Sequence, residues 1–329
     1  MRGISVAVIL GAVVAVAFGI HLAERYTGPL ELRRTIQQYG NADLMNNSTT
    51  YPRRAVDAEG YQLRIARPTH RVASQYWSID EYVYSVLPPK DIVSVSNYAY
   101  DRRYSNVYSF AESFHPAIAT DPEVILKVDP DLLLVSSTGR ADFADLLRNA
   151  GVPVFRMFTD FTTLEEIDRT ILLVGHLTGE DSAANRVHDE FQQAVYRATK
   201  RKPADSPSPR ILGYAGRYSY GDHTLFDDVV RRVGGVNVGA ENGLHGYGSI
   251  NTEQIARWDP EWIVSGAAQG QAKAALQHLM EDPAIALTTA AQTGHILVFE
   301  NQVFLPMSPF TTAILDALSE ALYGNRPKM

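Results

Sequence analysis

The sequence contains no cysteine. A disulfide scaffold, thiolate catalysis and cysteine-based zinc or iron–sulfur sites are therefore excluded, and His, carboxylate and Tyr side chains remain as metal ligands. The chain also has no excess of positive charge, because it contains 30 Lys and Arg residues and 37 Asp and Glu residues, which gives a net charge of −7. We expect no nucleic-acid partner, since such a chain has no field of cations to hold a phosphate backbone.

Two catalytic motifs are absent as well. There is no Gly-x-Ser-x-Gly nucleophile elbow of the α/β-hydrolase type. There is also no Gly-x4-Gly-Lys phosphate loop, so any ATP hydrolysis that the function requires would have to occur in a separate subunit. What the chain does have is 329 residues with 45% hydrophobic and 20% charged content. That is enough for one or two packed cores, and we expect a globular protein.

The N-terminus has the pattern of an export segment. Ile4 to Ile20 is almost entirely apolar or small after a positively charged start, and Ala15 and Ala17 form an A-x-A pattern that a signal peptidase could use. We expect residues 1–22 to be either a cleaved signal peptide or a retained membrane anchor. Both alternatives place the rest of the chain outside the cytoplasm, most simply in a periplasm.

The remaining sequence alternates short apolar runs with helical patterns after a polar spacer at residues 23–50. Alternation of this kind is typical of βαβ units with mostly parallel strands. We expect an α/β fold with two Rossmann-like lobes, at residues 51–179 and 203–329, joined by one long helix at residues 180–202. The expected strands are Arg71–Ser74, Ile92–Ser96, Leu132–Ser136, Val152–Met157, Arg210–Tyr214, Trp262–Ser265 and Ile296–Phe299.

The helix pattern is strongest on both sides of Gly179. The segment Thr162 to Gly175 opens with a predicted capping box between Thr162 and Glu165. The next segment, from Glu180, contains no Gly or Pro before Pro203, which predicts a helix long enough to cross a small domain. Leu225–Val233 and Phe310–Leu322 are further expected helices.

An internal repeat supports the division into two lobes. Pro122 to Val135 aligns without a gap with Thr252 to Ser265, and each copy has a Glu, a short helical turn, an Asp-Pro-acid triplet and an apolar strand. A residue before proline is pushed out of the α region, so each helix must end there and lead into the sheet.

This repeat and its surroundings resemble the extracytoplasmic substrate-binding proteins of ABC importers for iron–siderophores, haem and cobalamin. The resemblance covers roughly 270 residues. It rests on the order and spacing of several segments, because no single motif is decisive. It implies two lobes, one backbone helix and a ligand held in the cleft between the lobes. The segments that carry it are Tyr51–Gly60, Pro68–Ser74, Asp129–Val135, Gly151–Phe155, Val233–Val238 and Asp259–Val264.

The resemblance also implies a permease-docking role for Glu123 and Glu253, which match family carboxylates that pair with permease arginines. A Glu in the first turn of a helix is stabilised by the helix dipole and stays exposed, so two of them would give a two-point charge match. The alternative is helix capping, through a predicted box of Thr120 with Glu123 and through Asn251 or Thr252 in the second copy. The two roles are compatible.

The ligand is expected beyond the carboxyl ends of the strands. The segments there are rich in aromatic residues with interspersed Arg and His, which suits a large, flat ligand carrying negative groups, such as a ferric siderophore, haem or a corrinoid. The expected ligand-binding residues are Gln75, Tyr76, Trp77, Tyr98, Tyr100, Arg102, His115, Arg217, Tyr218, Tyr220, His223, His245 and Tyr247.

Some of these side chains are candidate metal ligands, because phenolate and imidazole bind iron or cobalt. The candidates are Tyr98, His115, Tyr218, His223 and His245. We expect no intrinsic cofactor and no catalytic residue: the protein is a non-enzymatic, monomeric receptor that binds a small-molecule metal complex and delivers it to the transmembrane subunits of an ABC permease.

Two other classes of protein remain open on the sequence. One is a secreted metallohydrolase that uses His70, His115, His223 and His245 with Asp101 or Asp222, although its usual short ligand spacings are absent. The other is a membrane-tethered sensor that uses the same cleft to report its ligand.

Overall fold

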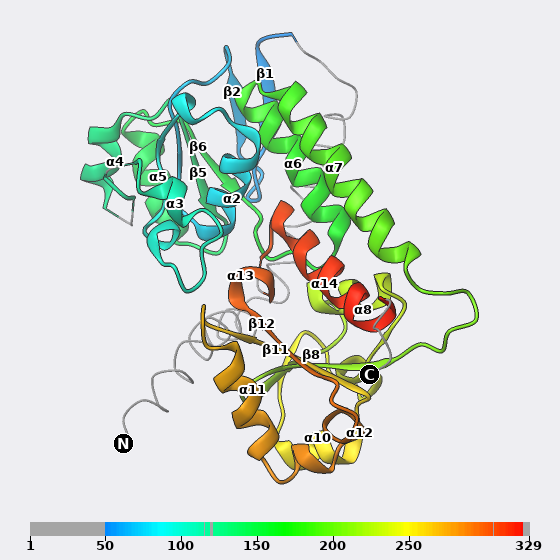
Figure 1. The fold of residues 1–329 in the computed structure, drawn as a ribbon. Helices are drawn as coiled ribbons and strands as arrows, with labels where there is room; N and C mark the ends of the chain where they lie inside the picture. The colour runs from blue at the N-terminus through cyan, green and yellow to red at the C-terminus, as the bar shows by residue number, and fades with distance from the viewer. Residues whose placement is uncertain (1–49, 115, 119–120, 305, 325–329) are drawn as a thin grey trace.

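The computed structural model describes residues 50–324, apart from 115, 119, 120 and 305. The expected leader at 1–22 and nearly all of the spacer therefore lie outside the described residues. The described chain forms two α/β lobes stacked one above the other, with two long helices, α6 (Leu164–Thr178) and α7 (Asp181–Lys200), running side by side along one flank (Figure 1). The expected α/β fold with two lobes is confirmed.

The N-terminal lobe is built on a parallel sheet of order β4-β3-β5-β6. Its strands are β3 (Val72–Ser74), β4 (Ile92–Ser94), β5 (Leu132–Ser136) and β6 (Val154–Met157), and an antiparallel hairpin of β1 (Arg53–Val56) and β2 (Gln62–Ile65) precedes them. β5 is buried along its whole length, as expected for an apolar strand covered on both faces. The helices of this part are α2 (Trp77–Val86), η2 (Pro89–Asp91), η3 (Asn97–Tyr100), α3 (Tyr108–Ala111), α4 (Pro122–Val128) and α5 (Ala141–Asn149).

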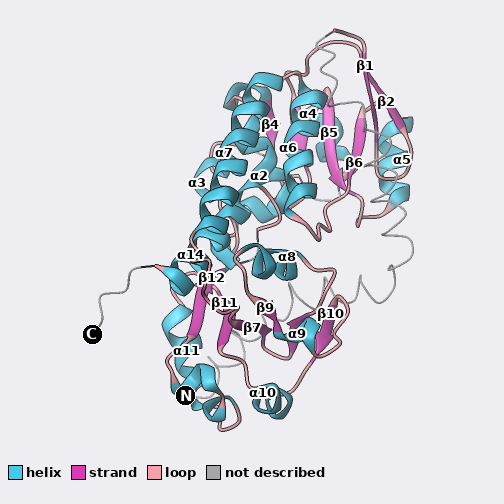
Figure 2. Ribbon diagram, turned by 90° about the vertical axis from the view of Figure 1, so that its right-hand side faces the viewer, coloured by secondary structure: helices cyan, strands magenta, loops and turns pink. Residues whose placement is uncertain are grey.

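The C-terminal lobe has a sheet of order β10-β8-β7-β11-β12, with β9 paired to β7 (Figure 2). β7 (Arg210–Ala215), β9 (Val236–Asn237), β11 (Trp262–Ala267) and β12 (Ile296–Glu300) are parallel, whereas β8 (Tyr218–Tyr220) and β10 (Tyr247–Ser249) form an antiparallel edge. The helices are α8 (Leu225–Arg232), α9 (Val238–Glu241), α10 (Thr252–Trp258), α11 (Ala272–Glu281), η4 (Ile285–Leu287), α12 (Thr289–Gln292) and α13 (Asn301–Phe304).

Over the described residues, the chain passes from the first lobe to the second once, through α7 and the segment that follows it. At 20 residues, α7 extends about 30 Å. The chain then ends with η5 (Pro309–Thr311), which contacts α2, and α14 (Thr312–Tyr323), which packs along α7. One continuous apolar core therefore includes Phe155 of the first lobe, Phe191 of α7, Val264 of the second lobe and Leu315 of α14.

Two capping predictions were wrong by one residue. The box that opens α6 pairs Thr163 with Glu166, not Thr162 with Glu165, and the backbone N–H of Thr162 instead donates to the Glu166 carboxylate at 2.7 Å. At α4 the cap is Asp121, whose side chain accepts from the N–H of Glu123 at 2.9 Å. In each case a neighbouring residue with the same capping chemistry takes the position.

The antiparallel edge of the second lobe was also missed. Tyr218, Tyr220 and Tyr247 were expected in loops, but they lie in the edge strands β8 and β10. A three-residue strand of sequence Tyr-Ser-Tyr is too short to show an alternating pattern above its surroundings.

Candidate ligand-binding site

The first lobe presents a group of aromatic rings where its strands end. Tyr76 follows β3 and precedes the first turn of α2, so its ring lies 6.0 Å from that of Trp77 and 6.3 Å from that of Tyr98, measured between centroids. Burial raises the pKa of the Tyr76 hydroxyl to about 12. Tyr98, by contrast, is 54% exposed. The group therefore has two half-buried inner rings, Tyr76 and Trp77, and an exposed outer ring.

The second lobe presents a matching group on its antiparallel edge. The ring of Tyr220 lies 5.5 Å from that of Tyr247, 5.0 Å from that of Phe226 and 5.8 Å from that of Phe304. Gly213 on β7 makes room for this packing, since a Cβ there would lie 2.6–2.7 Å from the rings of Tyr220 and Phe226. The strand register brings Tyr247 directly opposite Tyr220.

Both groups border the apolar core that runs through the two lobes, and Tyr76 and Tyr247 pack against it as half-buried residues. Burial raises the pKa of the Tyr247 hydroxyl well above its usual value, and the charge of Asp160, followed by the hydroxyls of Tyr220 and Tyr76, raises it further. Asp160 follows β6 in the first lobe and likewise raises the pKa of Tyr76, although less than burial does. Because Tyr76 and Tyr247 pack against the same core, we take the two groups together as one candidate site.

Two buried polar atoms in this region have no hydrogen-bond partner in the described part of the chain. One is the hydroxyl of Tyr220, which is 7% exposed, and the other is Oε1 of Gln302. The amide nitrogen of Gln302 donates across the lobes to the carbonyl oxygen of Arg102 at 2.5 Å. A buried polar atom without a partner is costly, and a ligand or water that satisfies it is the usual explanation.

The other expected ligand-binding residues occupy varied places. Gln75 and Tyr218 are half-buried and Arg217 is exposed. The hydroxyl of Tyr100 donates to the carbonyl oxygen of Phe114. The guanidinium group of Arg102 lies over the ring of Tyr108 at 4.1 Å, and His115 lies outside the described residues.

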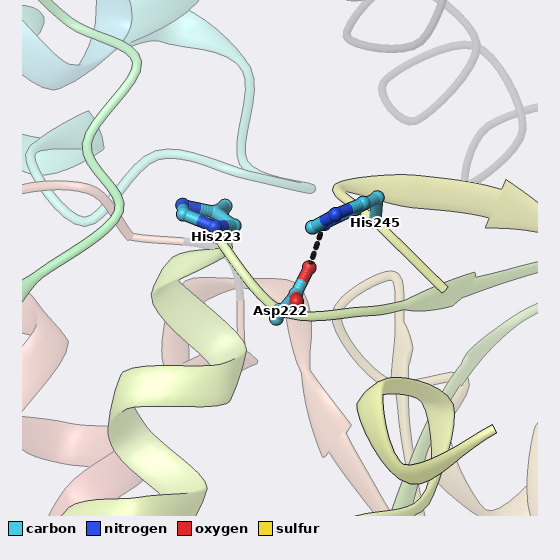
Figure 3. A group of neighbouring side chains, drawn as sticks. All are labelled: Asp222, His223 and His245. Atoms are coloured by element: carbon cyan, nitrogen blue, oxygen red, sulfur yellow. Dashed lines mark hydrogen bonds and ion pairs between the residues drawn. The ribbon is translucent and has the colours of Figure 1, made fainter. Parts of the chain in front are cut away.

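His223 and His245 lie together in the second lobe, beside Asp222 (Figure 3). Nδ1 of His245 is hydrogen-bonded to a carboxylate oxygen of Asp222. His70 is elsewhere, 3.3 Å from Asp91, and Asp101 pairs with Arg103. The His set considered for a metallohydrolase is therefore not assembled among the described residues.

Sequence reasoning missed three residues near the site: Asp160, Gln302 and Phe304. Asp160 follows a strand of the first lobe, so the rule used for the other loops would have included it. Gln302 and Phe304 belong to α13, which follows β12 at the corresponding position of the second lobe. Each of the three follows a strand, but none lies in the aromatic-rich segments on which the prediction was based.

Two adjacent carboxyl groups lie buried in α2 behind the site. Burial raises the pKa of both Asp80 and Glu81 to about 7. Asp80 accepts hydrogen bonds from the hydroxyls of Ser74 and Ser96. Glu81 accepts from Ser308 at 2.5 Å, which links α2 to the C-terminal segment. Neither carboxylate is among the ion pairs of the described residues, so no paired cation opposes the effect of burial on their pKa values.

The two helices expected to dock on a permease are closely similar. α4 and α10 each have seven residues, and Glu123 and Glu253 are both exposed in the first turn. The side chain of Asn251 caps α10 in a reciprocal box with Gln254, as one of the two expected alternatives. The helices lie in opposite lobes (Figure 1).

Comparison with known proteins gives consistent results. A cobalamin-binding protein of Halobacterium salinarum is 25% identical over 264 residues, which is 79% of this chain and 70% of that protein. The periplasmic haem-binding protein RhuT from Roseiflexus has a TM-score of 0.64 at 20% identity, covering 78% of this chain and 98% of that one. A protein of an ABC-type Fe3+-hydroxamate transport system from Saccharomonospora viridis has a TM-score of 0.63 at 18% identity, covering 83% and 99%. At these identities, the two structures support the fold alone.

Among the described residues, no helix has the length and apolar content needed to cross a bilayer. A family model described as periplasmic binding protein matches residues 72–303, more than half of the chain. The chain therefore belongs to the periplasmic binding protein family, and it is an extracytoplasmic substrate-binding protein, not an enzyme.

Proposed function

We propose that the protein captures a metal-containing organic ligand between its lobes and delivers it to an ABC permease. The ligand class comprises cobamides, haem and ferric siderophores, and a cobamide is the first candidate because the curated relative is a cobalamin-binding protein. The observation that carries the proposal is that Tyr76 and Tyr247, from opposite lobes, pack against one core. The buried hydroxyl of Tyr220, whose ring contacts that of Tyr247, has no hydrogen-bond partner there among the described residues.

The chemistry of the site suits such a ligand. Aromatic rings stack on the faces of a large conjugated or partly apolar molecule, and each stacked ring contributes roughly 0.5–1.5 kcal/mol beyond its buried area. Tyr98 supplies an exposed ring on the first lobe, and the Tyr220 hydroxyl offers a hydrogen bond from the second. Arg217 supplies an exposed cation for a carboxylate or phosphate on the ligand.

A titration of the purified protein with cyanocobalamin, haem and a ferric hydroxamate tests the proposal. We expect one of the three to shift its absorption spectrum and to quench the fluorescence of Trp77, with one ligand bound per protein. Tyr98→Ala and Tyr247→Ala should each weaken this binding roughly three- to tenfold. Tyr196→Ala is the matched control, because that ring is 64% exposed on α7.

Absence of binding by all three ligands would overturn the ligand class. Equal affinity in the wild type and in both site variants would instead place the ligand outside the aromatic site. Thermal melting of each variant separates lost contacts from lost structure.

We further propose that the lobes move little on binding. The core that runs through both lobes, α7 and α14 would have to be broken for a wide hinge motion. The cleft is then largely preformed, which lowers the entropy cost of binding. Small-angle X-ray scattering should give closely similar radii of gyration with and without ligand, and a clear contraction would contradict this.

Glu123 and Glu253 are proposed to seat the loaded protein on its permease. Their equivalent exposure on equivalent helices in opposite lobes supports a two-point charge match. The double variant Glu123→Lys, Glu253→Lys should abolish uptake into cells that depend on the transporter while leaving ligand affinity unchanged. Glu190→Lys, an exposed charge reversal on α7, is the control. Loss of ligand affinity in the double variant would show a structural role.

Residues 1–22 are proposed to direct export, and the boundaries of the lobes at 179 and 202 also stand as proposals. N-terminal sequencing of the protein recovered from its host distinguishes a cleaved signal peptide from a retained anchor.

A further inference from the structure

We propose that Asp222, His223 and His245 form a binding site for one divalent first-row transition-metal ion such as Zn²⁺. Each residue offers one ligand atom, and the three atoms lie within 4.8 Å of one another (Figure 3). The ion is bound as itself and not inside an organic complex, so the inference goes beyond the proposed function.

The backbone holds the segments that carry Asp222 and His245 tightly together. The N–H of Gly221 donates to the carbonyl oxygen of Gly246 at 2.7 Å, and the N–H of Gly246 donates back to that of Asp222 at 2.9 Å. The N–H of Asp222 donates to the carbonyl oxygen of Leu244 at 3.1 Å. A Cβ at Gly221 would lie 1.9 Å from that same oxygen, so only glycine permits this approach. Two of the three ligands are therefore preorganised.

His223 is held in an unusual conformation. Its φ is +54°, in the left-handed region that few residues other than glycine adopt. The next residue, Thr224, fixes the position because its side chain caps α8 and its hydroxyl donates to the carbonyl oxygen of Gly221 at 2.7 Å. Backbone strain of this kind occurs often at functional sites. Here it brings the His223 ring to 5.4 Å from the His245 ring, between centroids.

The pair of Asp222 and His245 alone does not account for this arrangement. A surface ion pair needs neither a second imidazole nor a strained residue beside it. Two imidazoles and one carboxylate are, however, the donors of many zinc and non-haem iron sites.

The distances fit an ion after side-chain rotation. Two metal–ligand bonds of about 2.1 Å at a tetrahedral angle separate their donor atoms by roughly 3.4 Å. His223 and His245 are both exposed, so their rings can turn inward without moving the backbone. Asp222 and His245 share a hydrogen bond, and a bound ion would take the place of its proton.

Three protein ligands leave a coordination position open for water or for an anionic group. Thiolates are absent from the chain, so the donor set favours Zn²⁺, Co²⁺, Ni²⁺ or Cu²⁺ over soft Cu⁺.

The test uses tag-free full chain without any organic ligand. Calorimetric titration with ZnCl₂ should show one saturable site, and Co²⁺ should give visible absorption bands of a protein-bound ion. His245→Ala, Asp222→Asn and His223→Asn should each weaken Zn²⁺ binding at least tenfold. Asparagine is chosen at 223 because it tolerates the left-handed conformation. His278→Ala, an exposed imidazole on α11, should leave binding unchanged.

Absence of saturable binding would overturn the proposal, and so would wild-type affinity in His223→Asn. Thermal melting checks that each variant is folded. Because no cobamide, haem or siderophore is present, failure of this experiment leaves the proposed function untouched.

Discussion

Asp129 and Asp259 take the same left-handed backbone conformation at the ends of equivalent helices, with φ of 51° and 45°. Each accepts a hydrogen bond at its carbonyl oxygen from an arginine at the start of a parallel strand. Arg71, just before β3, donates at 2.8 Å, and Arg210, the first residue of β7, donates at 2.7 Å. The internal repeat seen in the sequence therefore corresponds to the same arginine-to-carbonyl hydrogen bond in both lobes. It positions α4 and α10, and with them the two glutamates proposed for docking.

The two arginines should stabilise their lobes to a similar extent. Arg71 also donates to the carbonyl oxygen of Val128 and Arg210 to that of Trp258, so each satisfies the last carbonyls of a helix. Replacing either by Ala should lower the free energy of unfolding by about 1–2 kcal/mol. Chemical denaturation followed by circular dichroism measures this, with the exposed Arg169→Ala as control. Equal stability of all three variants and the wild type would contradict the assignment.

Replacement by glycine should change the free energy of unfolding differently at Asp129 and at Asp259. Asp129→Gly relieves the left-handed conformation but adds chain entropy, so its net effect on the free energy of unfolding should stay within about 0.5 kcal/mol. Asp259 additionally accepts from the N–H and the hydroxyl of Thr289, at 2.7 and 3.1 Å. Asp259→Gly should therefore be about 1–2 kcal/mol more destabilising than Asp129→Gly. Equal effects would mean that the Asp259 carboxylate contributes nothing.

Much of the fold was predictable because its signals are local. The apolar run Leu132–Ser136 and the Asp-Pro boundaries each determine a strand or a helix end from a few neighbouring residues. The long helix was expected at 180–202 and spans Asp181–Lys200. The capping shift from Thr162 to Thr163 shows the limit, because adjacent threonines offer the same chemistry.

The site was less predictable because its features depend on distant residues. Nothing near Tyr220 in the sequence shows that its hydroxyl has no hydrogen-bond partner within the described ranges, or that Tyr247 lies opposite it. The pairing of Asp222 with His245 joins residues 23 apart through an isolated β-bridge outside the strands, which the sequence does not reveal. Such relationships follow from register and lobe packing, which sequence periodicity does not specify.

The buried carboxyl of Glu81 should make stability depend on pH. Burial raises its pKa from 4.5 to about 7, so its contribution is fully present below pH 4.5 and is lost as pH rises through about 7. Glu81→Gln stays neutral and can keep the contacts with Asn106 and Ser308. Relative to the wild type, the variant should gain on the order of 1–3 kcal/mol between pH 5 and pH 9.

Melting temperatures measured across that range give the comparison. Asp80 titrates in both proteins, and the Glu81 charge is the smallest of the causes that shift its pKa, so its titration should differ little between them. Glu190→Gln, at an exposed position, should parallel the wild type. Parallel curves for Glu81→Gln and the wild type would show that Glu81 is not protonated on folding.

The hydroxyl of Tyr220 should have opposite effects on stability and on binding. It is buried among the rings of Phe226, Tyr247 and Phe304, and no described residue forms a hydrogen bond with it, so Tyr220→Phe should stabilise the free protein by about 1 kcal/mol. If the ligand supplies the missing partner, the same variant should bind it roughly two- to tenfold more weakly. Tyr196→Phe, on the exposed face of α7, should change neither quantity. A destabilised Tyr220→Phe would mean that ordered water already satisfies the hydroxyl, and unchanged affinity would remove it from the ligand contacts while leaving the ring packing in place.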